Sequence, residues 1–74
     1  MPNVLRMKRI ELDITQSQLS IKSGVEQFRI SLLERGLAIP NPDQLDRLSK
    51  VLGTSPEVLL KPAEAVALEV TEQK

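Results

Sequence analysis

The pattern of apolar and polar residues predicts a series of short helices, each marked by residues that favour helix ends. Asn3 is a suitable cap for the first helix, since its side chain can accept a hydrogen bond from the first turn. The apolar residues of this helix are Val4, Leu5, Ile10 and Leu12. A second helix is predicted to begin after Thr15, because Gln18 lies three residues later and completes a capping box. Gly24 can end this helix, since glycine adopts the left-handed conformation at low cost.

The third predicted helix follows the second after only a short turn, "SGV". In the second helix we expect Leu19 and Ser20 to face the core. In the third helix the apolar residues at core spacing are Val25, Ile30 and Leu33. Gly36 is the stop signal of the third helix.

A loop, "LAIPNPDQL", leads into the fourth predicted helix. Asn41 is its cap, Pro42 occupies the first helical position, and Gln44 completes a second capping box. Gly53 ends this helix. Its apolar residues are Leu45, Leu48, Val51 and Leu52.

A short fifth helix and a tail complete the chain. Ser55 and Pro56 repeat the pattern of a cap followed by proline, before Val58, Leu59 and Leu60. Pro62 interrupts this helix, so we assign residues 1–61 to one domain and residues 62–74 to a tail. In the tail, the alternation of Val66, Leu68 and Val70 suits a strand, whereas the alanines and glutamates suit a helix. Because no segment before Pro62 has the pattern of a strand, the predicted fold is all-α with five helices.

The composition excludes several kinds of chemistry. The chain has 74 residues, enough for one small domain, with one aromatic residue and neither cysteine nor histidine. A disulfide, a thiolate metal site, an imidazole base and a catalytic triad are therefore excluded. We expect no catalytic residues, no metal site and no cofactor, and so no enzyme.

Hydropathy and charge bear on the cellular setting. No apolar run approaches the roughly 20 residues that a membrane span needs, and the N-terminus lacks the layout of a signal peptide. A cytoplasmic protein with no membrane contact is the expectation. The net charge is zero, with +2 up to Gly36 and −2 after it. Zero net charge weighs against a strongly basic nucleic-acid binder. The difference in charge between the two parts of the chain is only a weak indication of a cationic face.

Two helices joined by a tight turn that contains glycine form a helix-turn-helix. The stretches that carry this pattern are "RIELDITQSQLSIKSGV", "ISLLERG" and "PNPDQLDRLSKVLGTSPEVLL". Over about residues 3–60 the chain resembles the Cro/lambda-repressor type, also called the Xre family. The resemblance implies a five-helix lambda-repressor-like domain that binds a double-stranded DNA operator and regulates transcription, as a dimeric repressor. The candidate residues for a homodimer interface are Leu59, Leu60, Val66, Leu68 and Val70, and we expect either Leu59 or Leu60 to close the core instead.

The resemblance also implies contacts to DNA at particular positions. Gln16, in the first turn of the second helix, matches a position that holds a phosphate. Gln27 matches a position that recognises bases, and its amide suits an adenine edge, with a plain surface glutamine as the alternative. Phe28 and Leu32 lie one helical turn apart, and their apolar side chains suit thymine methyl groups or a partner protein. Arg29 suits a phosphate or a guanine, with plain solvent exposure as the alternative.

Other positions matched by the resemblance are structural or depart from the family. Arg9 and Glu34 match a partly buried ion pair between the first and third helices, with two surface charges as the alternative. Arg35 is a further candidate for DNA contact, and its charge also favours the helix dipole. Glu26 stands where relatives often have Ser or Thr as a cap, and its carboxylate favours the helix dipole but would repel a nearby phosphate. Ser20 replaces the usual alanine at the closest approach of the two helices.

An alternative function follows from the apolar residues near the helix-turn-helix. Ile21 lies where relatives tend to be charged, and with Phe28 and Leu32 it could form an exposed apolar patch. Exposed apolar patches mark interfaces. The rival hypothesis is therefore a helix-turn-helix domain that binds protein, as an antirepressor or an antitoxin-like module.

Overall fold

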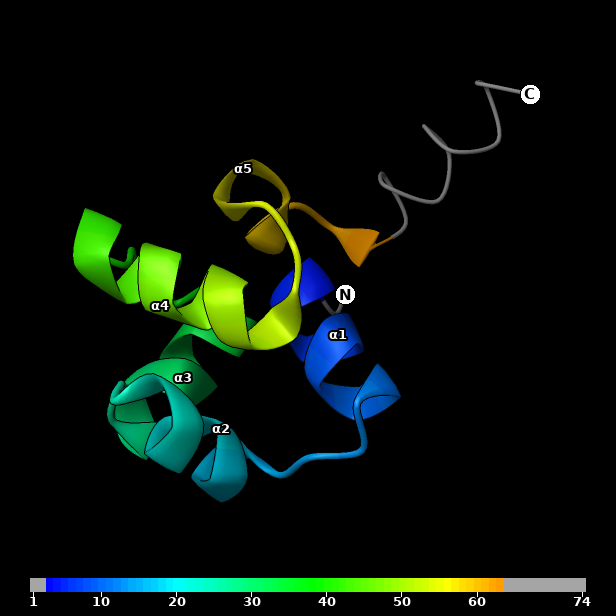
Figure 1. The fold of residues 1–74 in the computed structure, drawn as a ribbon. Coiled ribbons are helices and arrows are strands. Elements are labelled where there is room, and N and C mark those ends of the chain that lie inside the picture. The colour runs from blue at the N-terminus through cyan, green and yellow to red at the C-terminus, as the bar shows by residue number, and fades with distance from the viewer. Residues whose placement is uncertain (1–2, 64–74) are drawn as a thin grey trace.

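The structure is a computed structural model that describes residues 3–63, and five helices form this part of the chain (Figure 1). They are α1 (Val4–Glu11), α2 (Gln16–Ser23), α3 (Gln27–Glu34), α4 (Pro42–Leu52) and α5 (Pro56–Leu59). No strand occurs within residues 3–63, where Asn3 and Pro62 form an isolated antiparallel bridge. The all-α, five-helix prediction is therefore confirmed. The predictions for Val66, Leu68 and Val70 lie outside the described residues.

Side-chain caps define three of the helix starts, as predicted. The Asn3 side chain accepts a hydrogen bond from the Arg6 N–H at 3.1 Å. At α2 and α4 both bonds of the capping box are present, with Thr15 and Asn41 as the caps. The prediction for α5 is only partly right: Ser55 is the N-cap residue, but its side chain makes no cap hydrogen bond.

The core is aliphatic and draws residues from every helix. Its buried members are Val4, Leu5, Leu19, Val25, Ile30, Leu33, Leu48, Leu52 and Leu59. Of the two leucines at the end of α5, Leu59 closes the core and Leu60 is partly exposed. The apolar pattern of the first predicted helix is misleading at its end. Ile10 and Leu12 are 55% and 49% exposed, and Met7 packs against the core instead.

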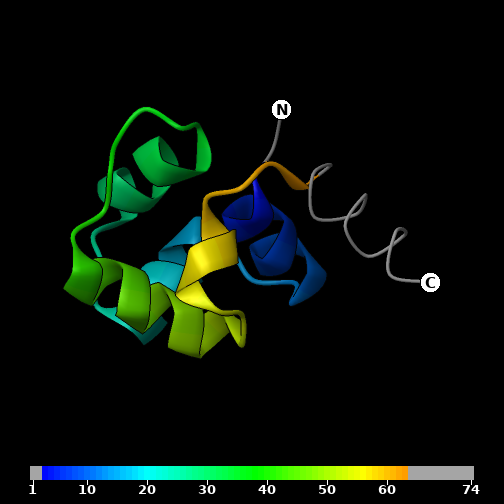
Figure 2. The same ribbon diagram turned by 90° about the horizontal axis from the view of Figure 1, so that it is seen from above.

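The helices form a small bundle around this core (Figure 1). α2 packs against both α3 and α4, while α1 contacts α3, α4 and α5. Figure 2 shows α5 beside the start of α1, where the backbone N–H of Val4 donates to the Lys61 carbonyl at 2.9 Å. The two ends of the described chain are thus joined by a backbone hydrogen bond.

Candidate nucleic-acid interface

The turn between α2 and α3 is held by a glycine and a buried serine. Gly24 has φ +76°, the left-handed conformation predicted for the end of α2. Ser23 is buried, and its hydroxyl donates to the Leu19 carbonyl at 2.7 Å and accepts from the Val25 N–H at 3.2 Å. These bonds connect the last turn of α2 to the first core residue after it, so they fix the direction in which α3 leaves. The role of Ser23 was not predicted from the sequence, although a serine beside a helix-ending glycine is a known turn-forming residue.

A buried ion pair joins α1 to α3. Arg9 Nε lies 2.5 Å from Glu34 Oε2, and Arg9 Nη2 donates to Glu34 Oε1 at 3.1 Å. The same guanidinium donates through Nη1 to the Ile14 carbonyl at 2.9 Å. The side chains of Arg9 and Glu34 are 13% and 3% exposed, so the bidentate pair is largely removed from water. The two charges suggested by the sequence therefore lie in direct contact, and Arg9 also binds the loop before α2.

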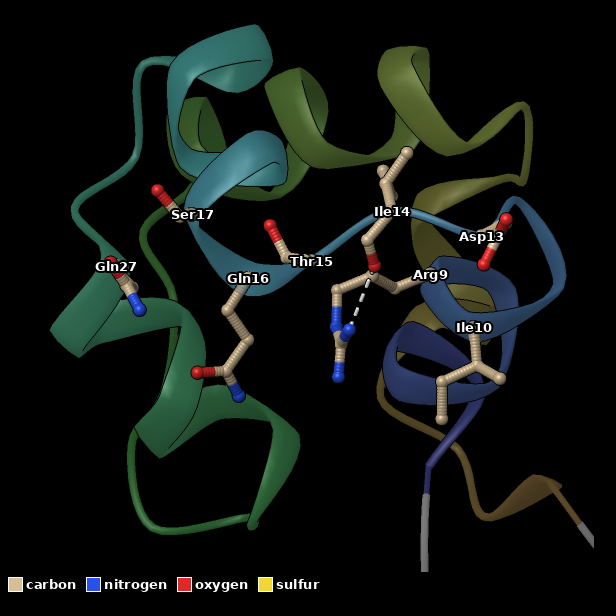
Figure 3. A pocket seen from close by; sticks show the side chains of 8 residues that line it. All are labelled: Arg9, Ile10, Asp13, Ile14, Thr15, Gln16, Ser17 and Gln27. Atoms are coloured by element: carbon tan, nitrogen blue, oxygen red, sulfur yellow. Dashed lines mark hydrogen bonds between the residues drawn. The ribbon is translucent and has the colours of Figure 1, made fainter.

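Gln16 extends this network to the start of α2. Its Nε2 donates to Glu34 Oε1 at 3.2 Å, a contact that was not predicted from the sequence. Figure 3 shows the side chains of Arg9, Gln16 and Gln27 around one pocket, with Gln16 projecting from α2 toward α3. Residues 3–63 thus bring the predicted phosphate residue and the predicted base-contacting residue to the same hollow.

Asp13 is an unpredicted member of the same pocket. It lines the hollow from the loop between α1 and α2 (Figure 3). Its φ of +58° is the only positive φ of a residue other than glycine within residues 3–63. Aspartate is among the residues that tolerate this conformation best, so an isolated aspartate beyond a helix end gave only a weak signal in the sequence.

The first turns of α3 present polar and apolar side chains to solvent. Gln27, Phe28 and Arg29 are all exposed, and Phe28 is 71% exposed. Leu32, one turn later, is half-buried, so it is less available than Phe28 for an external contact. Arg35 is exposed, and its Nε donates to the Ser31 carbonyl at 3.3 Å. The start of α3 is therefore the part of this helix that can reach another molecule.

The residues on either side of the turn include an N-cap without a cap hydrogen bond and an exposed apolar side chain. Glu26 is the N-cap of α3, but its side chain makes no cap hydrogen bond. Ile21 on α2 is 81% exposed, whereas Ser20 beside it is half-buried, less deeply than the fully buried Leu19. The start of α3 thus lacks a side-chain cap, and α2 exposes one isoleucine.

Two kinds of feature are absent from the part of the chain that the structure describes. Within residues 3–63 no three carboxylates lie close enough together to form a metal site. No helix in that range is long and apolar enough to cross a membrane.

Comparisons with known proteins agree with this geometry. A family model described as "Helix-turn-helix" matches residues 5–59. Two proteins of Mycobacterium tuberculosis, from strains CDC 1551 and H37Rv, are each 38% identical to the chain over 55 residues. Both carry the name uncharacterized HTH-type transcriptional regulator, and the match covers 74% of this chain and 39% of each relative. The chain thus matches well under half the length of these relatives.

No solved structure matches the chain at a significant level. The family match nevertheless spans all five helices, from the first turn of α1 to the end of α5. It includes the ion pair, the turn at Gly24 and the exposed start of α3. The chain belongs to the Xre (Cro/lambda-repressor-type) family of helix-turn-helix proteins.

Proposed function

We propose that this chain is a transcriptional regulator that binds a double-stranded DNA operator as a homodimer and acts as a repressor. One observation carries the proposal: α3 begins directly after the short turn at Ser23 and Gly24, and it exposes Gln27, Phe28 and Arg29. A helix of this kind fits the major groove, where each base pair presents a distinct pattern of donors and acceptors. In the helix-turn-helix arrangement, the N-terminal residues of the second helix are those that contact base edges.

In this proposal α2 lies across the DNA backbone. Its first backbone N–H groups form a positive helix end, which favours a phosphate. Gln16 lies in the same turn, and its amide nitrogen carries two N–H donors. One of them is used by Glu34 at 3.2 Å, so the other is free to donate to a phosphate oxygen. Glu34 thereby holds the Gln16 side chain in place before DNA arrives.

The side chains of α3 would supply sequence preference. Gln27 can form two hydrogen bonds with an adenine edge, and Phe28 can contact a thymine methyl group. Arg29 and Arg35 are exposed cations that suit phosphates on either side of the groove. Because the whole chain has zero net charge, we expect modest affinity for random DNA.

A selection of bound sequences from random duplex DNA tests this function. The full chain should enrich one sequence with two-fold symmetry and half-sites about 34 Å apart, one turn of DNA. Gln27→Ala should cost about 1–3 kcal/mol at one base pair of each half-site and little elsewhere. If the full chain enriches no sequence above the starting pool, the proposed function is wrong.

One observation favours a second function, the binding of a protein. Ile21 and Phe28 are 81% and 71% exposed and lie on the two helices of the helix-turn-helix. Apolar side chains this exposed are typical of contact surfaces when they are contiguous. If Phe28→Ala leaves the enriched sequence and its affinity unchanged but abolishes binding to a purified protein partner, the protein-binding function is the better account.

A further inference from the structure

Glu26 has a carboxylate with nothing to bind inside the described chain. It is the N-cap of α3, with φ −58° and ψ 140°, and it is exposed. Side chains at this position normally accept from a backbone N–H two or three residues later, and this bond is absent. Within residues 3–63 the Glu26 side chain also has no ion-pair partner and no other hydrogen bond. Its acceptor positions are therefore all available to an external donor.

The position of Glu26 decides which donor this can be. It directly precedes Gln27, at the end of α3 that we have placed in the major groove. A phosphate is excluded as its ligand, because an ionised carboxylate and a phosphate repel each other. In the major groove only two groups donate hydrogen bonds: the N4 amine of cytosine and the N6 amine of adenine.

The chemistry of a carboxylate separates these two bases. An ionised carboxylate only accepts hydrogen bonds. Adenine presents the N7 acceptor beside its N6 amine, and so it suits an amide, which both donates and accepts. Cytosine presents its amine without that N7 acceptor, and acidic side chains are its usual partners. Guanine and thymine present acceptors in this groove, which repel a carboxylate.

We propose that Glu26 is a specificity-determining residue, which accepts a hydrogen bond from a cytosine N4 amine beside the base that Gln27 contacts. This inference rests on the proposed function, since it needs α3 in the major groove. This contact would explain why Glu26 replaces the usual Ser or Thr cap, since the chain loses a helix cap and gains a hydrogen-bond acceptor for one base. The same charge would lower affinity for sequences that have guanine or thymine at that position.

The test uses the full chain and the duplex enriched in the selection. The cytosine at the proposed contact is replaced by an analogue that lacks the exocyclic amine, and affinity is measured for the parent, Glu26→Gln and Glu26→Ala. Loss of the amine should weaken the parent about tenfold and leave Glu26→Ala nearly unchanged. Glu26→Gln should also accept thymine at this position, because its amide can donate to O4. Glu57→Gln is the matched control, an exposed glutamate on α5 whose replacement should leave every preference unchanged.

Two results would overturn the inference. The first is that removing the cytosine amine weakens DNA binding equally in the parent and in Glu26→Ala. The second is higher affinity of Glu26→Gln for all sequences alike, which would show that Glu26 only repels the DNA backbone. Thermal melting of each variant confirms that it is folded. Enrichment of no sequence by the parent would contradict the proposed function itself, so the two failures are distinguishable.

Discussion

The Arg9 guanidinium binds three acceptors on two different segments of the chain: both Glu34 carboxylate oxygens and the Ile14 carbonyl. A buried ion pair of this kind does not have to add stability compared with apolar residues, because both charges are removed from water. Removing one partner is costly, since the other charge remains buried and unpaired. Glu34, whose side chain is 3% exposed, is the residue that would be left in this state.

Arg9→Met should therefore destabilise the domain by about 3–5 kcal/mol, a large part of the total stability of a domain this small. Arg47→Met is the matched control. Arg47 pairs with Asp43 on the surface, where the side chains are 52% and 69% exposed, so its loss should cost less than about 1 kcal/mol. Urea unfolding of the two variants measures the difference. Equal shifts of the unfolding midpoint would show that the buried pair has no special role in stability.

At the scale of the elements, a left-handed glycine follows each of α2, α3 and α4, as predicted; Gly36 stands one residue beyond the cap of α3, whereas the other two are themselves caps. Gly24 ends α2 with φ +76° and Gly53 ends α4 with φ +64°. The surroundings of these two caps differ. A Cβ at Gly24 would lie 3.0 Å from Arg47 Nη1, whereas a Cβ at Gly53 would meet nothing within 4 Å. The turn of the helix-turn-helix is therefore packed under an α4 side chain, while the end of α4 is open.

Gly53→Ala should cost about 1–2 kcal/mol of unfolding free energy, because alanine is strained in the left-handed conformation. Gly24→Ala should cost the same plus a smaller amount, since the flexible, exposed Arg47 side chain must move away from Asp43. The extra cost should stay below about 1 kcal/mol, the usual limit for an exposed ion pair. Combining Gly24→Ala with Arg47→Ala should remove this extra cost in unfolding free energy. If the extra cost persists in the double variant, the strain lies elsewhere in the turn.

Helix boundaries were predictable because their signals are local. Asn3, Thr15 and Asn41 accept from N–H groups three residues away, and each glycine sets its own φ. Ser55 shows the limit of such signals, since a cap residue can occupy its position without making the bond.

Burial at the end of α1 was less predictable. Ile10 and Leu12 continue the apolar pattern, but only tertiary packing decides which residues of an eight-residue helix face the core.

The candidate site was predictable only as far as the family pattern reaches. The family pattern matched the residue types at four positions of the site and so indicated their roles: Arg9, Gln16, Gln27 and Glu34. The bond from Gln16 to Glu34 spans 18 positions, and no local rule predicts it. Asp13 was missed for a related reason: its positive φ depends on how the loop joins α1 to α2.

At the scale of the whole molecule, the length of α3 limits what one copy can recognise. Eight helical residues span about 12 Å. B-DNA rises about 3.4 Å per base pair, so one such helix covers only about three or four base pairs. Two copies related by a two-fold axis would double the site, which is the physical reason for the proposed homodimer.

We expect the C-terminal tail to contribute to that dimer. Leu59 cannot do so, because it is fully buried in the core of one copy, whereas Leu60 is 38% exposed. Sedimentation of the full chain should show a dimer at micromolar concentration, and a form that ends at Ala63 should dimerise less tightly. Truncation after Ala63 keeps the bridge between Asn3 and Pro62, so the folded body is preserved. If both forms are monomers, or if both dimerise equally tightly, the tail is not the interface.

In the proposed function α3 recognises base pairs in the major groove. The affinity of the full chain for the selected duplex, measured with single changes to one groove at a time, tests this recognition. Replacing thymine by uracil, or guanine by 7-deazaguanine, changes only the major-groove edge, while replacing guanine by inosine removes the minor-groove amine. We predict that major-groove changes within each half-site weaken binding and that inosine does not. Uracil at the Phe28 contact should have no further effect on Phe28→Ala. Binding that is indifferent to every major-groove change, or that responds only to inosine, would rule out recognition of the major groove by α3.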